Sequence, residues 1–209
     1  RFRREARAAA AIHHQNVVAV YDCFETRGTH YIAQELVEGG FTLDDHLEEQ
    51  KGKGDLPLGY FRDTARIFSL LADAFHHAHA SGVIHRDIKP SNIMMGDDGE
   101  PRITDFGLAR LVDGPGITRD GIFLGTPAYA SPEQVAGEEL DERSDVYSLG
   151  VLLHRLATRG LYPFQAETLG ELRGVHGTAA TARPWSATRC ASGRALQLEK
   201  WARPSGCPP

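Results

Sequence analysis

The stretch HRDIKPSN, residues 85–92, decides which fold this chain of 209 residues adopts. It places His, Arg, Asp, Lys and Asn within eight positions, directly after the apolar run GVI. Asp87, Lys89 and Asn92 bring a carboxylate, an ammonium and an amide onto one loop. A plain turn accounts for any one of these residues, because Asp and Asn are common turn formers, but it does not account for the whole set. The stretch therefore indicates a loop that carries chemistry.

A second carboxylate follows at Asp105, thirteen residues after Asn92. The short apolar runs 92–95 and 102–104 flank the turn sequence GDDGEP and predict a hairpin that returns Asp105 to the loop. Carboxylate oxygens and phosphates are typical ligands of Mg²⁺, and an ammonium neutralises phosphate charge. A nearby carboxylate can orient a hydroxyl for attack. These are the parts that phosphoryl transfer needs.

The strands and the short helix that precede the loop are predicted from their residue types and from turn and cap signals. Two β-branched and aromatic runs, residues 16–25 and 30–37, are separated by a Gly-containing turn and predict an antiparallel strand pair. Thr42 and Asp45, three residues apart, predict a capping box at the start of a short helix over residues 43–50.

Three helices complete the predicted elements. The Arg-, Glu- and Ala-rich residues 1–14 favour a helix on propensity. Residues 60–82 and 144–160 predict amphipathic helices that end near Gly82 and Gly160. Strands come first and helices later, which predicts an α+β fold. The apolar residues of the first amphipathic helix recur at spacings of three and four: Phe61, Ala65, Phe68, Leu71, Ala72, Phe75 and Ala78.

Composition narrows the class of protein. The chain is 41% hydrophobic and 24% charged, with a net charge of −5, so it has a globular composition without the basic footprint of a nucleic-acid binder. Its three cysteines show no paired spacing and are interpreted as reduced thiols of a cytosolic protein. Apolar runs stay below the roughly 20 residues of a membrane span. The start has no apolar signal region and no Met, which suggests the interior of a longer product.

The last part of the chain has a different character. Residues 1–172 carry a net charge of −10, whereas residues 173–209 carry +5 and both tryptophans. The tail shows no helical or strand period, so two interpretations stay open. It is either a disordered basic tail or a stretch read out of frame or misjoined.

The motifs together resemble the eukaryotic-like protein kinase domain of bacterial serine/threonine kinases. The resemblance covers residues 1–172 and implies a kinase-like α+β fold with an incomplete N-lobe, residues 1–37. A mostly helical C-lobe, truncated after helix F, would span residues 38–172. The matched segments are RFRREA for helix C, YIAQELVEGG for the hinge, HRDIKPSN for the catalytic loop, DFGLAR, GTPAYASPEQ for the end of the activation segment, and RSDVYSLGVLL for helix F.

The resemblance implies ATP and Mg²⁺ as cofactors and assigns roles around the γ-phosphate. Asp87 would orient the acceptor hydroxyl and take its proton, and Lys89 would contact the γ-phosphate. Asn92 and Asp105 would hold Mg²⁺. Lys89 together with Thr126 resembles serine/threonine rather than tyrosine kinases.

Further residues are implied to bind the base or to build the site. The backbone of Glu35 and of Val37 would meet the adenine edge, and Met94 would pack under the ring. His85 would pack beneath Phe106. The remaining structural and regulatory assignments are Glu5 as the helix C glutamate, Arg86 as a mark of control by activation-loop phosphorylation, Thr118 as the favoured phosphosite, Gly107 of the DFG motif, Glu133 as partner of a late arginine, and Asp145 as a brace for the catalytic loop.

Several features depart from the family pattern. The sequence contains no GxGxxG loop and no VAIK-like lysine before Glu5, which would leave that carboxylate without its family partner. Gln34 occupies the position of an apolar gatekeeper, and Phe41 is an extra residue after the hinge. Two hypotheses follow: a fragment of a serine/threonine kinase that is inactive alone, or a non-catalytic, pseudokinase-like binding module.

The resemblance also implies partners and a location. The expected partners are proteins with serine or threonine acceptors and a second kinase copy for trans-autophosphorylation. Nucleic acid and membrane segments are not expected in this chain. A cytoplasmic location is expected, with the parent protein anchored in a membrane.

Overall fold

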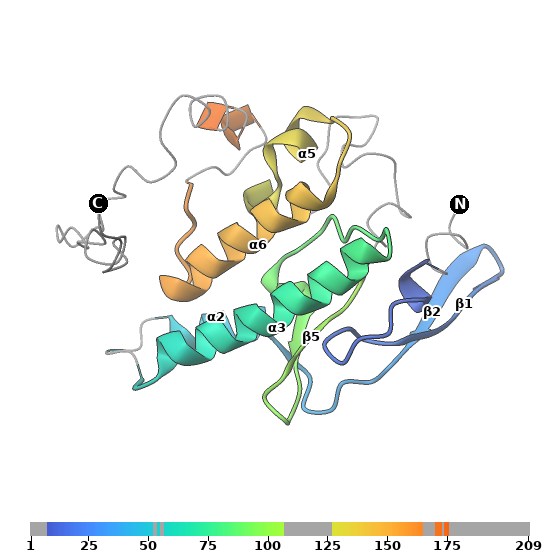
Figure 1. The fold of residues 1–209 in the computed structure, drawn as a ribbon, viewed down its shortest axis with the longest axis horizontal. Helices are drawn as coiled ribbons and strands as arrows, with labels where there is room; N and C mark the ends of the chain where they lie inside the picture. Colours follow the sequence, from blue (N-terminus) through green and yellow to red (C-terminus); the bar gives the residue numbers. More distant parts are fainter. Residues whose placement is uncertain are drawn as a thin grey trace, which may run out of the picture.

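The structure is a computed structural model of the chain, and it describes residues 8–51, 54, 57–106, 127–164, 170–172 and 174–175. Two small sheets and two long helices make up most of the described fold (Figure 1). Within the described ranges, no helix has the length and apolar character that a membrane crossing requires. The mixture of strands and helices confirms the predicted α+β class.

The first sheet pairs β1 (Val20–Thr26) with β2 (Thr29–Gln34) in antiparallel register. Arg27 and Gly28 both have positive φ, 51° and 79°, as a two-residue hairpin turn of the I′ type requires. The predicted strand pair is confirmed, although β1 begins four residues later than expected. The helix predicted over 1–14 is shorter: of the part described, residues 8–10 are helical and residue 11 is already a turn.

The second sheet has the order β3–β4–β5 and is antiparallel throughout. Its strands are β3 (Phe41–Thr42), β4 (Ile93–Met95) and β5 (Pro101–Ile103). The β4–β5 hairpin confirms the prediction that residue 105 returns to the end of the loop. Ile103 also pairs with Val17, and its carbonyl accepts a hydrogen bond from the Val18 amide at 2.9 Å. The chain before β1 is therefore tied to the second sheet.

Two helices on the N-terminal side of the loop follow the predicted signals. Helix α2 (Leu43–Gln50) begins with a reciprocal capping box between Thr42 and Asp45, as predicted. Helix α3 (Tyr60–Ala80) ends just before Gly82, whose φ of +73° suits glycine at a helix end.

The buried face of α3 differs in part from the predicted stripe. Leu71, Phe75 and Ala78 are buried as expected, but Phe61, Ala65 and Ala72 are exposed. The predicted set spread over more of the helix circumference than the core covers. The core side is instead completed by Tyr60, Thr64 and Ala74.

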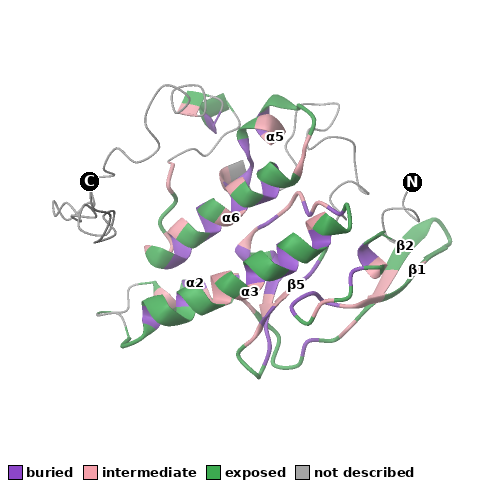
Figure 2. Cartoon of the chain, in the orientation of Figure 1, coloured by how far each residue is buried: buried purple, intermediate pink, exposed green. Residues whose placement is uncertain are grey.

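The C-terminal half is built around α6 (Glu142–Ala157), which ends near Gly160 at a φ of +105°. The short helices η1 (Pro90–Asn92), η2 (Pro127–Tyr129) and α5 (Pro132–Ala136) connect the site to it. Figure 2 shows buried residues along one side of α3 and of α6 and mostly exposed residues in β1 and β2. Residues 170–172 and 174–175 are helical, and Leu172 packs in a small cluster with Ala130 and Val135.

Candidate active site

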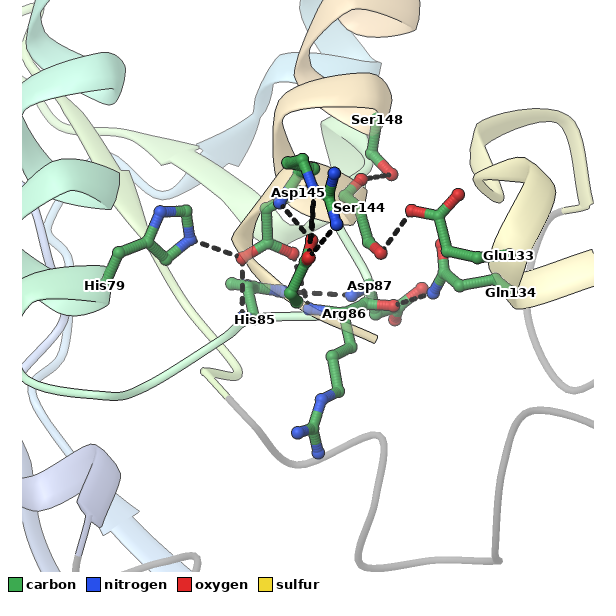
Figure 3. Close-up of polar contacts among 11 residues, drawn as sticks. His79, His85, Arg86, Asp87, Glu133, Gln134, Ser144, Asp145 and Ser148 are labelled. Atoms are coloured by element: carbon green, nitrogen blue, oxygen red, sulfur yellow. Dashed lines mark hydrogen bonds and ion pairs between the residues drawn. The ribbon is translucent and has the colours of Figure 1, made fainter. Parts of the chain in front are cut away.

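Hydrogen bonds to one buried carboxylate, that of Asp145, fix the backbone at the start of HRDIKPSN. Asp145 lies in the first turn of α6 and is 1% exposed. Its Oδ2 accepts the His85 amide and its Oδ1 accepts the Arg86 amide, both at 2.8 Å (Figure 3). Arg86 has a φ of 71°, a conformation that costs a non-glycine residue free energy. The paired hydrogen bonds fix the loop in this conformation, which is the contact expected of a brace.

His79 is a third partner of the same carboxylate. Its Nε2 lies 2.8 Å from Asp145 Oδ2 and the side chain is mostly buried (Figure 3). Buried charge is costly unless it is paired and hydrogen-bonded, so three donors around Asp145 make its burial tolerable. Sequence reasoning missed His79. The available signal was its spacing of four from the buried Phe75, which places both on the core side of α3.

Asp87, Lys89 and Asn92 meet at one point. Lys89 Nζ lies 2.8 Å from Asp87 Oδ2. Asn92 Nδ2 donates to the Asp87 carbonyl at 2.8 Å and to Asp87 Oδ2 at 3.1 Å. Pro90 begins the short helix η1, a position where its missing amide proton costs no helical hydrogen bond. This turn of the chain brings Asn92, which is 7% exposed, back to Asp87. The three predicted residues are thus brought together by their own loop.

Asp105 is brought to the same place by the β4–β5 hairpin. The amide of Thr104 donates to the Asn92 carbonyl at 3.0 Å, which sets the next residue beside the loop. Asp105 is exposed and has a φ of 62°. The following residue, Phe106, is buried, and its ring centroid lies 4.8 Å from that of His85.

His85 links the loop to this strand end. It is fully buried, its Nδ1 accepts the Asp87 amide at 3.2 Å, and its Nε2 lies 2.9 Å from the Thr104 carbonyl. A ring with an acceptor at Nδ1 and a carbonyl opposite Nε2 is the neutral tautomer that carries its proton on Nε2. His85 therefore holds both acidic segments in place without adding charge.

The donor set fits Mg²⁺ better than a softer metal. Both side-chain contacts of Asp87 with described residues use Oδ2, and the amide nitrogen of Asn92 faces Asp87. The Asn92 amide oxygen and the exposed carboxylate of Asp105 remain as hard oxygen ligands. Within the described ranges, no three His, Cys, Asp or Glu side chains gather as a metal-binding group. Two protein oxygens suit an ion that completes its shell with phosphates and water.

Of the residues predicted for the adenine, Glu35 and Val37 lie between β2 and β3, and Met94 lies on β4. Glu35 is fixed against Ala19 on both sides: its amide donates at 2.8 Å to the Ala19 carbonyl, and its Oε2 accepts the Ala19 amide at 3.2 Å. Val37 and Met94 both flank Gly40, because a Cβ on that glycine would lie 3.0 Å from the Val37 carbonyl oxygen and 3.4 Å from Met94 Cε. The structure thus places Val37 and Met94 in one neighbourhood.

Gln34 and Thr104 join this neighbourhood to the acidic loop. Gln34 Nε2 donates to Thr104 Oγ1 at 3.4 Å, across 70 residues of sequence. Thr104 Oγ1 in turn lies 3.5 Å from Asp105 Oδ1. The sequence marked Gln34 as a departure, and the structure shows that its side chain makes a long-range hydrogen bond from the end of β2. Thr104 itself was missed, since a lone threonine in a short strand carries no signal.

The segment after the activation loop contacts the site through α5. Gln134 completes a capping box with Ser131, and its Nε2 donates to the Arg86 carbonyl at 2.7 Å. Glu133 accepts a hydrogen bond from the Ser144 hydroxyl. Burial is the largest influence and opposes ionisation of Glu133, but hydrogen bonds from the Ser144 hydroxyl, from the backbone amide of Glu133 and from the Ser131 side chain together outweigh it and lower the pKa of the carboxyl. Of the predicted residues, Glu5, Gly107, Thr118 and Thr126 lie outside the described ranges.

Comparison with known proteins identifies the class. The sequence model of the family described as "Protein kinase domain" matches residues 1–192, which is more than half of the chain. The chain therefore belongs to the protein kinase domain family. The matched range extends past residue 172, where the resemblance was expected to end.

Individual relatives are bacterial serine/threonine-protein kinases. PknL of Mycobacterium tuberculosis is 42% identical over 168 residues, which cover 80% of this chain and 40% of PknL. PrkC of Bacillus subtilis is 37% identical over 188 residues, covering 89% of this chain and 28% of PrkC. The chain spans less than half the length of these relatives. The solved kinase domain of Mycobacterium tuberculosis PknI has a TM-score of 0.62 and 28% identity, covering 78% of this chain and 58% of that domain.

Proposed function

We propose that the chain is a fragment of a protein serine/threonine kinase that, as part of the intact protein, transfers the γ-phosphate of ATP to serine and threonine hydroxyls. The observation that carries the proposal is the cluster of Asp87, Lys89 and Asn92 on a loop fixed by the buried Asp145. The names of the relatives PknL and PrkC support the same class of reaction.

Each step of the transfer has a side chain suited to it. The Asp87 carboxylate accepts the proton of the acceptor hydroxyl, and the hydroxyl oxygen forms a bond to the γ-phosphorus. The bond from that phosphorus to the bridging oxygen breaks, and ADP leaves. Lys89, which already touches Asp87 at 2.8 Å, neutralises charge on the transferred group. Because the side-chain contacts of Asp87 with described residues use Oδ2, Oδ1 is the oxygen proposed to face the acceptor.

Two residues are proposed to hold Mg²⁺, which supplies charge neutralisation on the phosphates when bound. These are the amide oxygen of Asn92 and the carboxylate of Asp105. The Thr104 amide, bonded to the Asn92 carbonyl at 3.0 Å, keeps the two ligands in register.

The adenine is proposed to lie against the backbone of Glu35 and Val37, with Met94 under the ring. The double contact of Glu35 with Ala19 supports this placement, because it fixes the backbone that leaves β2. Fixed backbone donors and acceptors select a planar base without a loss of side-chain entropy.

Regulation and partners form part of the same proposal. Arg86 precedes Asp87 and is proposed to bind a phosphate group on Thr118 of the activation segment, since guanidinium pairs strongly with phosphate. Trans-autophosphorylation requires a second copy of the kinase. Proteins with serine or threonine acceptors are the proposed substrates, in the cytoplasm.

The test is Asp87→Asn in the intact protein. Transfer of ³²P from ATP to dephosphorylated casein is expected to fall by about 10³-fold, because general base catalysis is worth roughly 10²–10⁴. Asp63→Asn, an exposed carboxylate in the first turn of α3, serves as the matched control and should keep wild-type activity. Equal transfer by wild type and Asp87→Asn, or phosphotyrosine as the sole product, contradicts the proposal.

A further inference from the structure

A buried arginine on α6 takes no part in the chemistry described above. Arg155 is 4% exposed, although it lies in the last turn of the helix. Its guanidinium lies 4.4 Å from the centroid of the Tyr162 ring and 5.9 Å from that of Tyr129. Asp44 of α2 is 3.5 Å away, but that carboxylate is 45% exposed, so water screens the pair. The two rings and neutral acceptors therefore carry much of the stabilisation of this cation.

The main polar partner of Arg155 is the hydroxyl of Tyr129. Arg155 Nη1 donates to Tyr129 Oη, and Nε donates to the Gly160 carbonyl at 3.3 Å. Burial raises the pKa of Tyr129 and outweighs the opposing effect of the arginine, so the hydroxyl is neutral and accepts this hydrogen bond. The hydrogen bond from the Arg155 cation to the neutral phenol is directional, because it forms only when the Tyr129 hydroxyl lies at the guanidinium.

Tyr129 is held by α6 at both of its polar ends. Ser148, seven residues before Arg155 and on the same side of the helix, donates to the Tyr129 carbonyl at 2.7 Å. Arg155 holds the hydroxyl at the other end of the residue. The Tyr129 backbone and ring are thus fixed in position and direction relative to α6.

From Tyr129 the contacts lead to the acceptor side of the proposed site. Ser131, two residues on, caps α5 together with Gln134. Gln134 then donates to the Arg86 carbonyl, the residue directly before Asp87. The proposed adenine neighbourhood, by contrast, lies just after β2 and on β4. These contacts link Tyr129 to the residue directly before Asp87, and none of them involves Glu35, Val37 or Met94.

We infer that Arg155 is a positioning residue for the protein acceptor: through the Tyr129 hydroxyl it fixes the segment between the activation loop and α5. The inference rests on the proposed kinase function and deepens it. It assigns the acceptor side, and not ATP binding, to this buried cation.

The experiment measures kinetics of the intact protein with ATP and dephosphorylated casein as the probe acceptor. Arg155→Gln is expected to raise the KM for casein by about tenfold, as expected for the loss of a hydrogen bond to a charged group, while the KM for ATP stays within twofold. Arg155→Lys keeps the charge without the planar fork and should restore part of the loss. Tyr129→Phe removes the hydroxyl but keeps the ring, so it tests the same contact if Arg155→Gln fails to fold.

Coupling decides whether the arginine acts through the tyrosine. The double variant should be no worse than the poorer single variant, since both remove one interaction. The control is Arg143→Gln on the same helix, whose side chain is 84% exposed and pairs with Asp141. Additive losses, or equal rises in the KM for ATP and for casein, overturn the inference. Failure of the kinase proposal looks different, because wild type then shows no Asp87-dependent transfer.

Discussion

The α3–α6 region and the β1–β2 sheet adjoin opposite proposed sides of the candidate site, but they differ in how many of their residues are buried. Leu71 of α3 and Leu152 of α6 are both 0% exposed. Every residue of β1 and β2 is half-buried or exposed. A two-stranded hairpin is marginally stable in water by itself. The proposed acceptor side is therefore set on the stable core of the described fold, whereas the proposed base side adjoins the less buried β1–β2 sheet.

The largest expected effect separates the two regions directly. Leu152→Ala should lower the free energy of unfolding by about 2–5 kcal/mol, because it leaves a cavity in a packed core. Phe24→Ala on β1, where the ring is 44% exposed and stacks on Tyr31, should cost below about 1 kcal/mol. Urea denaturation followed by circular dichroism measures both.

The neighbouring Leu153→Ala is the matched control, since that side chain lies on the same helix and is 42% exposed. It should behave like Phe24→Ala. A cost for Phe24→Ala as large as that for Leu152→Ala would remove the distinction between the two regions.

The same difference explains how far the sequence predicts the structure. Local signals were sufficient for the capping box at Thr42 and for the β4–β5 hairpin, because turn and cap chemistry acts over a few residues. Asp87, Lys89 and Asn92 are close in sequence, so their convergence followed from one motif.

Contacts that join distant segments were harder to predict. The circumference of α3 was misjudged at Phe61, because period alone does not say which side a neighbour will cover. Contacts such as His79 with Asp145 and Arg155 with Tyr129 depend on two elements meeting in space. Nothing within either element announces the partner, so these contacts are found only in the folded chain.

An intermediate loss of unfolding free energy is expected at Asp145, the carboxylate that joins α6 to the loop. Asp145→Ala leaves the amides of His85 and Arg86 without their acceptor and should cost about 2–3 kcal/mol of unfolding free energy. Phosphotransfer should fall more steeply than stability, because the loop that carries Asp87 loses its anchor. The check is thermal unfolding beside casein phosphorylation. Asp141→Ala, which removes the N-cap of the same helix, is the control and should cost about 1 kcal/mol with little loss of transfer.

The smallest effect tests a cap at the surface, where the α2 helix joins the second sheet. Hydrogen bonds from the Thr42 hydroxyl and amide lower the pKa of Asp45 below its ordinary value of 3.8. A lowered pKa means that the stabilising contribution is complete above the unfolded value and is lost as pH falls through the folded one. Asp45→Asn should therefore be slightly less stable than wild type near neutral pH and converge with it in acid below pH 3.8. Parallel urea curves at pH 7 and in acid measure this, and a difference that grows on acidification would show that Asp45 is not held by its cap.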